Sequence, residues 1–389
     1  MHNLPRIRAC MVSYYFWPEY SGSAVQALNL SRHLGNRGVE PFIVTANLSG
    51  SAAHDRIDGI DVYRLPVARS ARLQLPSFIA SLCRFLAFHR ARFDVVHAHG
   101  TLWHGIAGPM ARLLGKKSLL KVAMAQSDID FRRQGLLLGG INQALVRRFD
   151  VYIATTDAIA REFGDNGLDV NRVRLIPNGV DTEMYTLASP QERVALRRQL
   201  GLPDGPLVTF VGIINQRKNI EGILRVWRSV AQRGLAGHLL LAGPRPGGEA
   251  DEYFVRLRTF VAQHGLESRV TFLEARSDIP NILQASDIFF FPSLQEGMPN
   301  AVLEAMGSGL ACLVSRGSGT DGVVIDGANG FSRDVQDEAG FAEVLIRLLG
   351  DSLLRASVGQ AARQSVLENY SLDAVADRYL KLYRELLAS

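Results

Sequence analysis

Short apolar runs separated by helical segments occur in both halves of the chain, and this alternation constrains the fold more than any other pattern. In the first half, Ala and Leu recur at helical spacing over 24–34 until Gly35 and Gly38. Short strands alternating with helices indicate a parallel sheet that helices cover on both faces. We predict strands at 7–13, 41–46, 62–65, 94–99, 118–124 and 151–155, and again at 207–212, 238–242, 269–273, 288–292 and 310–315.

The repeated pattern predicts two domains. A chain of 389 residues exceeds the size that one α/β core usually reaches. Pro, Asn and Gly interrupt the chain at 176–185, and a helical stretch follows at 191–200. We therefore expect two Rossmann-like α/β domains, 1–180 and 181–368, with an amphipathic helix over 369–389. Because ligands of open α/β sheets bind at the carboxyl ends of the strands, the cleft between the domains is the expected active site.

The charge of the chain is uneven. The net charge is +5, yet residues 1–180 hold 22 Lys and Arg against 13 Asp and Glu, whereas the remainder holds 21 against 25. A basic half indicates an anionic membrane surface or a phosphorylated acceptor as its partner. No apolar run is long enough to cross a bilayer, and the first residues lack the layout of a signal peptide, so we expect a cytoplasmic protein, peripheral at most on the inner membrane face. The three distant cysteines favour neither a disulfide framework nor a zinc site.

The segment 292–309, PSLQEGMPNAVLEAMGSG, is the most informative. A buried strand runs into a Gly/Pro turn, and a helix follows that starts near Pro299. The N-terminus of such a helix presents backbone N–H groups and a partial positive charge that suit a diphosphate. Glu296 on the turn and Glu304 on the second helical turn suit a sugar and a ribose, because carboxylates accept hydrogen bonds from hydroxyls. Two solvated glutamates on a surface turn are the alternative.

Two further motifs carry charge at the ends of predicted strands. Arg217 and Lys218 follow 207–212 and could neutralise a leaving phosphate, unless they are a solvent-facing pair. His97 and His99 share one face of a strand, with His104 nearby. A metal site lacks a local carboxylate or cysteine, so we expect none, and a buried structural histidine is the alternative to a substrate contact by His99.

Gly22 follows a long turn and would let backbone approach a ligand. The segment is not G-x-G-x-x-G, so a dehydrogenase is disfavoured. In the helix expected over 75–92, Phe78, Ile79, Leu82, Phe85 and Leu86 form one stripe, with Arg84 opposite. A stripe packed in the core and a basic helix lying on a membrane are both consistent with that pattern.

Taken together, these motifs resemble those of the retaining glycosyltransferases of family four, which have the GT-B fold and include bacterial hexosyltransferases of polysaccharide, lipopolysaccharide and lipid glycosylation. The resemblance spans nearly the whole chain. It rests on YSGSAVQALNLSRHL, DVVHAHG, IPNGVD, VGIINQRKN, EGMPNAVLEAMGSG and YSLDAVADRYLKLYREL in this order.

The resemblance implies a role for each site residue. Glu296 contacts the donor sugar and Glu304 the ribose, while Arg217 and Lys218 hold the diphosphate. His99 lies near the sugar and the acceptor, and the C-terminal helix packs back toward the N-terminal domain. The further donor-binding residues that we expect are Gly22, Gly212, Gly297, Met298, Pro299, Asn300 and Arg276, the last on one of two loops, 244–248 and 274–277, that bear on the choice of donor.

Three positions depart from the family pattern. Ile213 stands where many members have an arginine, Ser21 replaces the first glycine of a Gly-Gly pair, and Ala125 stands where a histidine is often found. These departures leave the donor site intact and concern the acceptor side more.

The function expected from this resemblance is retaining transfer of a hexose from a UDP- or GDP-sugar to a glycan or a polyprenyl-diphosphate-linked acceptor, without a metal or other cofactor. Nucleic acid is not an expected partner. A sugar-nucleotide epimerase of the same fold would use the same donor pocket without an acceptor. A non-catalytic carbohydrate- or nucleotide-binding protein is a further alternative, which the presence of both glutamates and the Arg-Lys pair disfavours.

Overall fold

The structure, a computed structural model, describes residues 6–19, 21–100, 104–122, 129–131, 134–245, 247 and 249–389. The chain divides into two compact units. The N-terminal unit comprises Met1–Gly179 with Leu372–Ser389, and the C-terminal unit comprises Val180–Ser371. Tyr20, Ala125 and parts of the 118–124 strand and the 244–248 loop lie outside the described residues.

The N-terminal unit is built on an eight-stranded sheet in the order β3-β4-β2-β1-β5-β6-β7-β8. Its neighbouring strands run parallel, apart from β3, which pairs antiparallel with β4. The strands are β1 (Ile7–Val12), β2 (Val39–Asn47), β3 (His54–Ile57), β4 (Ile60–Pro66), β5 (Val95–His99), β6 (Lys117–Lys121), β7 (Val151–Ala154) and β8 (Val173–Leu175). The helices are α1 (Gly22–Gly35), α2 (Ala71–Phe88), α3 (Ala107–Leu113), α4 (Leu136–Val146), α5 (Asp157–Asp165) and α13 (Leu372–Ala388), with short 3-10 turns at Arg90–Arg92 and Val170–Arg172.

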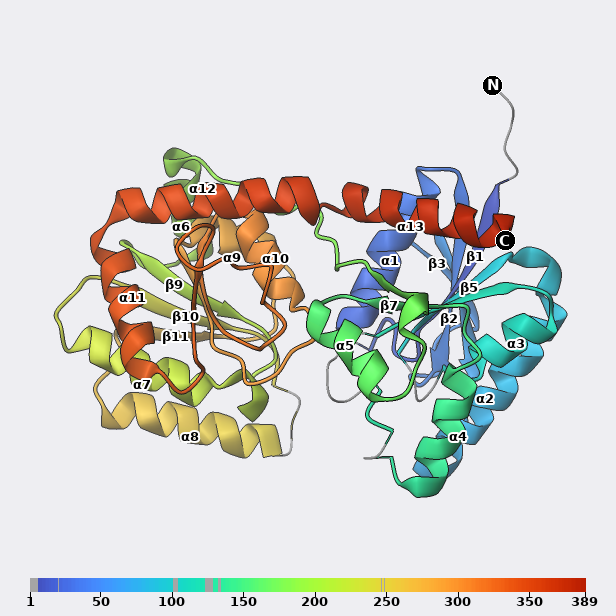
Figure 1. The fold of residues 1–389 in the computed structure, drawn as a ribbon. Coiled ribbons are helices and arrows are strands. Elements are labelled where there is room, and N and C mark those ends of the chain that lie inside the picture. Colours follow the sequence, from blue (N-terminus) through green and yellow to red (C-terminus); the bar gives the residue numbers. More distant parts are fainter. Residues whose placement is uncertain are drawn as a thin grey trace. The chain divides into compact units, whose positions relative to one another are not determined.

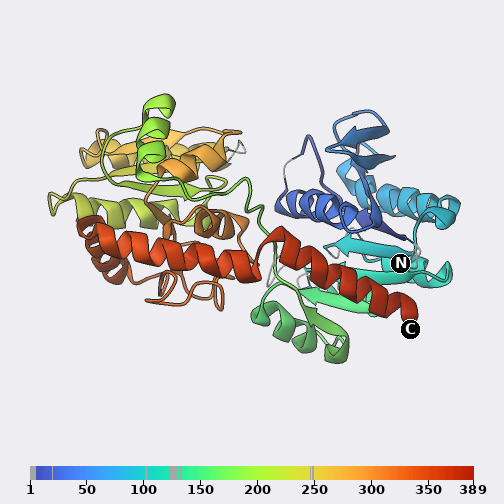
Figure 2. The same ribbon diagram turned by 90° about the horizontal axis from the view of Figure 1, so that it is seen from above.

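Helices cover both faces of this sheet (Figure 1). Side chains of α2, α3 and α5 pack with one face, including Phe78 and Phe163. Side chains of α1 and α13 pack with the other, including Leu28 and Tyr379. The last helix, α13, runs beside the sheet (Figure 2), and Arg37, in the turn after α1, donates to Asp377 of α13 at 2.6 Å. The C-terminal helix therefore completes the core of the N-terminal unit.

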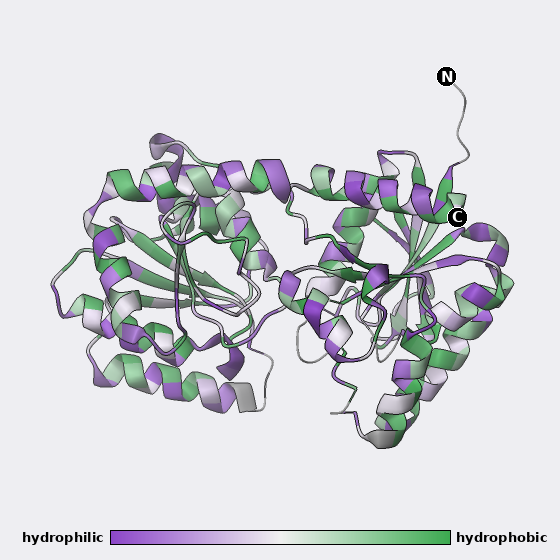
Figure 3. Ribbon diagram, viewed as in Figure 1, coloured by the Kyte–Doolittle hydropathy of each residue, from purple (hydrophilic) through white to green (hydrophobic). Residues whose placement is uncertain are grey.

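The C-terminal unit holds a six-stranded, wholly parallel sheet in the order β11-β10-β9-β12-β13-β14. In both units the strands are mostly hydrophobic, as sheets buried on two faces require (Figure 3). The strands are β9 (Leu207–Val211), β10 (His238–Ala242), β11 (Val270–Leu273), β12 (Ile288–Phe291), β13 (Ala311–Ser315) and β14 (Phe331–Arg333). The helices are α6 (Pro190–Leu200), α7 (Ile220–Ala231), α8 (Glu249–Gln263), α9 (Ile279–Ala285), α10 (Asn300–Gly307), α11 (Glu338–Gly350) and α12 (Ser352–Asn369), with a 3-10 turn at Gln216–Lys218.

The predicted α/β class and its two parallel sheets are confirmed. Three strands were missed: β3, β8 and β14. Their side chains are mostly half-buried or exposed in β3 and β8, and β14 is only three residues long, so none of them presents a continuous apolar run. These short segments lie at sheet edges, where one pairing partner suffices.

The apolar stripe of α2 belongs to the core. Phe78, Leu82, Phe85 and Leu86 are buried, while Arg84 is exposed. The membrane-lying interpretation of this stripe is therefore wrong, because its apolar side chains are already packed within the N-terminal unit. None of the helices in the described residues is long and apolar enough to cross a bilayer.

Each sheet has a topological switch point, where the chain order reverses between two central strands. It lies between β1 and β5 in the N-terminal unit and between β9 and β12 in the C-terminal unit. Helical connections leave the carboxyl ends of such strands in opposite directions, which opens a crevice for ligands. The segments that follow β9 and β12 are those in which the sequence predicts the donor-binding residues.

Candidate active site

The turn after β12 leads directly into α10. Pro299 occupies the N-cap position in an extended conformation, and Asn300 is the first helical residue, close to the predicted start. Gly319, on the loop after β13, lies against this turn with φ of +75°. A β-carbon at position 319 would overlap the carbonyl oxygen of Gly297, so this close approach of two backbones requires glycine.

Three donors converge on one oxygen of Glu296. Lys218 Nζ and Arg217 Nη1 each lie 2.7 Å from Glu296 Oε1, and the Ser293 hydroxyl donates to the same oxygen at 2.6 Å. Arg217 also donates to the carbonyl of Gln295 at 2.7 Å. Glu296 and Lys218 are buried, with 8% of each residue exposed. Residues from the ends of β9 and β12 thus form one positively charged cluster around a buried carboxylate.

Local backbone structure fixes the two cations. Asn215 caps the 3-10 turn by accepting from the amide of Lys218 at 3.2 Å. Asn219 adopts the left-handed conformation at φ of +54°, accepts from the amide of Gly222 and donates to the carbonyl of Pro292 at 3.2 Å. Two asparagines therefore set the turn and tie it to the strand end that carries Glu296.

The environment of Lys218 is apolar on one side. Its Nζ lies 4.8 Å from the centre of the Phe291 ring. Burial lowers the pKa of Lys218, and the carboxylate of Glu296 opposes that shift. A lysine held this way needs an anion beside it, which Glu296 supplies in the described structure.

Glu304 lies on α10, about one helical turn after the first residue of the helix. Burial raises its pKa to about 7, while a hydrogen bond from Tyr185 lowers it. The described residues place no basic side chain among the causes of this shift. A carboxyl group kept partly protonated at neutral pH, with no structural ion pair, is typical of a functional site.

The other predicted donor-binding residues differ in their surroundings. Gly297 is buried beside Gly319, Met298 packs in the core, and Gly212 follows β9 and donates to the carbonyl of Ala242 at 2.9 Å. Arg276 follows the edge strand β11 and forms a two-pronged ion pair with Asp278, at 2.7 and 2.6 Å. Arg276 is therefore already paired within its own loop, and its contact with a donor stays a prediction.

Two predicted residues belong to the N-terminal unit. Gly22 is the first residue of α1 rather than part of the preceding turn. His99 is the last residue of β5 and is buried, with its ring stacked on His97 at 4.5 Å between centroids. Among the described residues, no group of three His, Cys, Asp or Glu side chains could hold a metal ion.

Sequence reasoning missed four residues of the donor-side arrangement. Ser293 and Tyr185 hydrogen-bond the two glutamates. Ser315 donates to the carbonyl of Ser293 at 2.5 Å, and Gly319 abuts Gly297. The Gly-Ser-Gly run at 317–319, one residue after a predicted strand, was the available signal for the last contact.

Comparison with known proteins bears directly on this geometry. The family model "Glycosyl transferases group 1" matches residues 192–365, and "Glycosyl transferase 4-like domain" matches residues 21–179. The first match contains Arg217, Lys218, Glu296 and Glu304. The chain belongs to the family-four glycosyltransferases.

Relatives with known names align along most of both chains. The N-acetyl-alpha-D-glucosaminyl L-malate synthase of Bacillus anthracis is 23% identical, covering 95% of this chain and 96% of its own. The D-inositol 3-phosphate glycosyltransferase of Xylanimonas cellulosilytica is 29% identical, covering 94% and 91%. The UDP-Gal:alpha-D-GlcNAc-diphosphoundecaprenol alpha-1,3-galactosyltransferase of Escherichia coli is 26% identical, covering 80% and 84%.

Solved structures place this glycosyltransferase in the GT-B fold. The sucrose-phosphate synthase of Thermosynechococcus elongatus matches with a TM-score of 0.83 at 21% identity, covering 98% of this chain and all of the other. The Anabaena protein HepE, in complex with UDP-glucose, matches with a TM-score of 0.80 at 18% identity and the same coverage. The predicted fold and family are therefore confirmed.

Proposed function

We propose that the chain is a retaining glycosyltransferase that moves a hexose from a UDP- or GDP-sugar to a glycan or lipid-linked acceptor, in the synthesis of cell-surface polysaccharide or glycolipid. The convergence of Lys218 and Arg217 on Glu296 at the switch point of the C-terminal sheet carries this proposal. Family membership and the UDP-glucose complex of HepE support a nucleotide-sugar donor.

In this proposal the donor lies along the ends of β9, β12 and α10. Arg217 and Lys218 turn to the diphosphate, and the N-terminal turn of α10 adds a partial positive charge. Once the two cations have turned to the diphosphate, Glu296 accepts hydrogen bonds from sugar hydroxyls. Glu304 accepts hydrogen bonds from the ribose diol. Gly212, Gly297 and the backbone of 298–300 approach the sugar and diphosphate closely.

The chemical step follows from these charges. The bond between the anomeric carbon and the diphosphate oxygen breaks, so positive charge develops on the sugar ring and negative charge on the leaving oxygen. Arg217 and Lys218 stabilise the leaving oxygen, and we propose that they do so without a metal ion. The acceptor hydroxyl then attacks from the same face, its oxygen bonds the anomeric carbon, and its proton passes to the departing phosphate oxygen.

The acceptor is proposed to bind the N-terminal unit and to carry an anionic group. The three relatives are named for L-malate, inositol 3-phosphate and a diphosphoundecaprenol-linked sugar, each of which bears carboxylate or phosphate. The positive charge of residues 1–180 suits such acceptors. His99, at the carboxyl end of β5, is the proposed catalytic contact on this side.

A lipid-linked acceptor would bring the protein to the inner face of the membrane. The exposed apolar side chains of α4, Leu137, Leu138 and Ile141, support this part of the proposal, since each is more than half exposed. Arg147 and Arg148 follow at the end of the same helix and are exposed. Exposed apolar side chains on a helix that ends in cations are a combination that favours an anionic bilayer surface.

Thermal unfolding with a panel of UDP- and GDP-sugars tests the donor class. A ligand that binds only the folded protein at 100 times its Kd stabilises it by about 2.7 kcal/mol. We expect a clear rise in Tm with the sugars of one nucleotide. No response to any of them would contradict the proposal, and conversion of a free donor sugar without an acceptor would favour an epimerase instead.

A further inference from the structure

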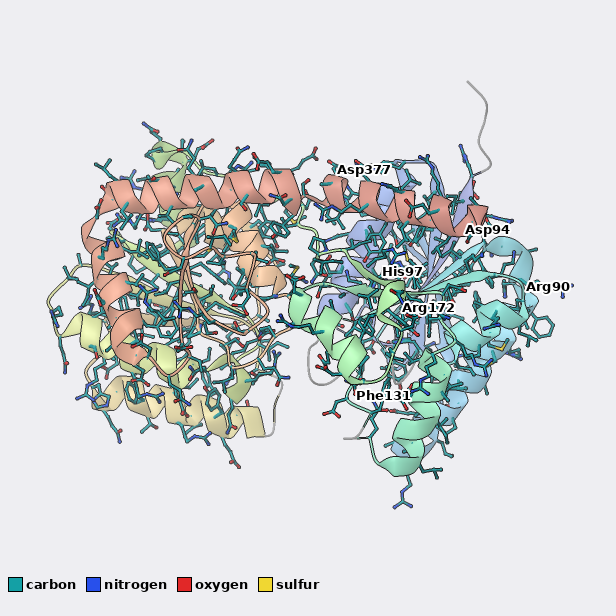
Figure 4. All side chains as sticks on the ribbon, in the orientation of Figure 1. Arg90, Asp94, His97, Phe131, Arg172 and Asp377 are labelled. Carbon is teal, nitrogen blue, oxygen red and sulfur yellow. The ribbon has the colours of Figure 1, made fainter. Side chains whose placement is uncertain are left out.

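Four basic side chains are buried together in the N-terminal unit. His97 and His99 lie on β5, Lys121 is the last residue of β6, and His104 follows β5. Each residue is at most 3% exposed. His99 and Lys121 are direct neighbours in the parallel register of the two strands. Figure 4 labels His97 in the sheet of the N-terminal unit and Asp377 on α13, the helix whose side chains pack against that sheet.

The hydrogen-bonding capacity of this cluster is largely unused. His97 Nδ1 lies 2.8 Å from the hydroxyl of Tyr383. Within the described part of the chain, His97 Nε2 and both ring nitrogens of His99 have no partner, while His104 faces the backbone of Gly100. A neutral imidazole carries one donor and one acceptor, and leaving such groups buried without partners is unfavourable.

The cluster also carries charge without a countercharge. Burial lowers the pKa of Lys121 to about 7. Burial also lowers the pKa of His97 and His99, and the charge of Lys121 adds to both shifts. No acidic side chain of the described residues contributes to any of these shifts or to that of His104. Titratable side chains of the described residues that contact the cluster include Tyr379, whose ring centre lies 5.9 Å from Lys121 Nζ, and Tyr383.

The position of the cluster indicates a ligand rather than a structural role. β5 is the strand next to β1 at the switch point of the sheet, where ligands of open α/β sheets bind. We propose that Lys121 and His99 form an oxyanion subsite that receives a carboxylate or phosphate of the acceptor. This assignment rests on the proposed function and identifies the residues that recognise the acceptor's anionic group.

Binding of an anion must change the protonation of the subsite. A negative group beside Lys121 favours its charged form, so a complex formed at pH 8 takes up close to one proton. Above pH 7 the free protein holds mostly neutral Lys121, and anion affinity falls roughly tenfold per pH unit between pH 8 and 9. His97 keeps its hydrogen bond to Tyr383 and serves to position His99 through ring stacking.

Calorimetric titration of the full chain tests the subsite. The probes are L-malate and inorganic phosphate, each titrated at pH 7, 8 and 9 in two buffers of different ionisation enthalpy. The variant is Lys121→Met, and its matched control is Lys117→Met, which removes a lysine at the opposite end of the same strand. Lys121→Arg keeps the charge but cannot lose its proton.

We expect the wild type and Lys117→Met to bind one of the two anions, with proton uptake at pH 8, and Lys121→Met to bind it at least tenfold more weakly. Lys121→Arg should bind the same anion with an affinity that does not change between pH 7 and pH 9. Preference for malate or for phosphate identifies a carboxylate or a phosphate acceptor.

Equal affinity of the wild type and Lys121→Met, or binding without proton uptake, would overturn the subsite. If Lys121→Met does not fold, the proton uptake of the wild type decides alone. Failure of both anions in a protein that binds UDP or GDP also overturns the subsite and leaves the donor assignment standing. Failure of nucleotides as well contradicts the proposed function itself.

Discussion

The substitution Glu304→Gln should stabilise the folded protein while it weakens nucleotide binding. Burial raises the pKa of Glu304 from 4.5 to about 7. Between these values the folded protein keeps a proton that the unfolded chain releases, so the carboxyl group increasingly destabilises the fold as the pH rises, and its full effect is reached above pH 7. Glutamine has nearly the same shape and carries no charge, so it removes this penalty.

The size of the effect follows from the shift. At about 1.4 kcal/mol per pKa unit, a rise in the pKa of Glu304 from 4.5 to about 7 lowers the free energy of unfolding by about 3 kcal/mol at pH 8. Because Glu304 is not fully buried by surface area, we expect a gain of about 1–3 kcal/mol in the free energy of unfolding. Near pH 4.5 the variant and the wild type should be equally stable. Tyr185 can still donate to the amide oxygen of glutamine.

Nucleotide binding should change in the opposite direction. Loss of a hydrogen bond to a charged group costs about 1.5–3 kcal/mol, which corresponds to a roughly 10- to 150-fold higher Kd for UDP or GDP. Urea unfolding at pH 5 and 8 measures stability, and calorimetry at pH 8 measures binding. Glu343→Gln, which changes an exposed glutamate of α11, is the control and should alter neither.

A Glu304→Gln protein that is less stable than the wild type at pH 8 would refute the reasoning from burial. An unchanged nucleotide Kd would refute the ribose contact. The combination of higher stability and weaker binding is expected only of a group that is held in an unfavourable state for the sake of a ligand.

Two further predictions concern the backbone contact in the C-terminal unit and the exposed apolar end of α4. Gly319→Ala should lower the free energy of unfolding by about 1–3 kcal/mol and also weaken donor binding, because its methyl group displaces Gly297. The control is Gly322→Ala, at a similar positive φ of +79° but in open space. In urea unfolding it should show only the penalty of the backbone conformation. Leu137→Ser should reduce binding to anionic vesicles in flotation assays at low salt, and vesicle binding by the wild type should weaken as salt rises. A wild type that floats with neutral and anionic vesicles alike, or with neither, would contradict the membrane part of the proposal.

The larger part of the fold follows from local pattern. Alternating apolar runs and amphipathic segments predicted the strands of both parallel sheets, since a strand buried on two faces must be apolar throughout. The β3–β4 hairpin escaped this reasoning because β3 is half-buried or exposed along its length. Its pairing depends on a tertiary partner rather than on its own composition.

The candidate site could likewise be predicted only in part from the sequence. Glu296, Arg217 and Lys218 could be marked from sequence because each follows a strand end, but their meeting at one oxygen depends on β9 and β12 being neighbours in the sheet. Lys121 gave no signal at all. Its pairing with His99 depends on the register of two strands, and its unusual environment depends on burial by α13. Periodicity carries no information about either.

The most direct test of the donor site is turnover of Lys218→Ala with a purified donor and acceptor. Loss of the charge that stabilises the leaving diphosphate should lower kcat by about 10²- to 10³-fold. Lys381→Ala, which removes an exposed lysine of α13, should retain wild-type turnover. Near-normal turnover of the folded Lys218→Ala protein would contradict the assignment of Lys218 and Arg217 to the diphosphate.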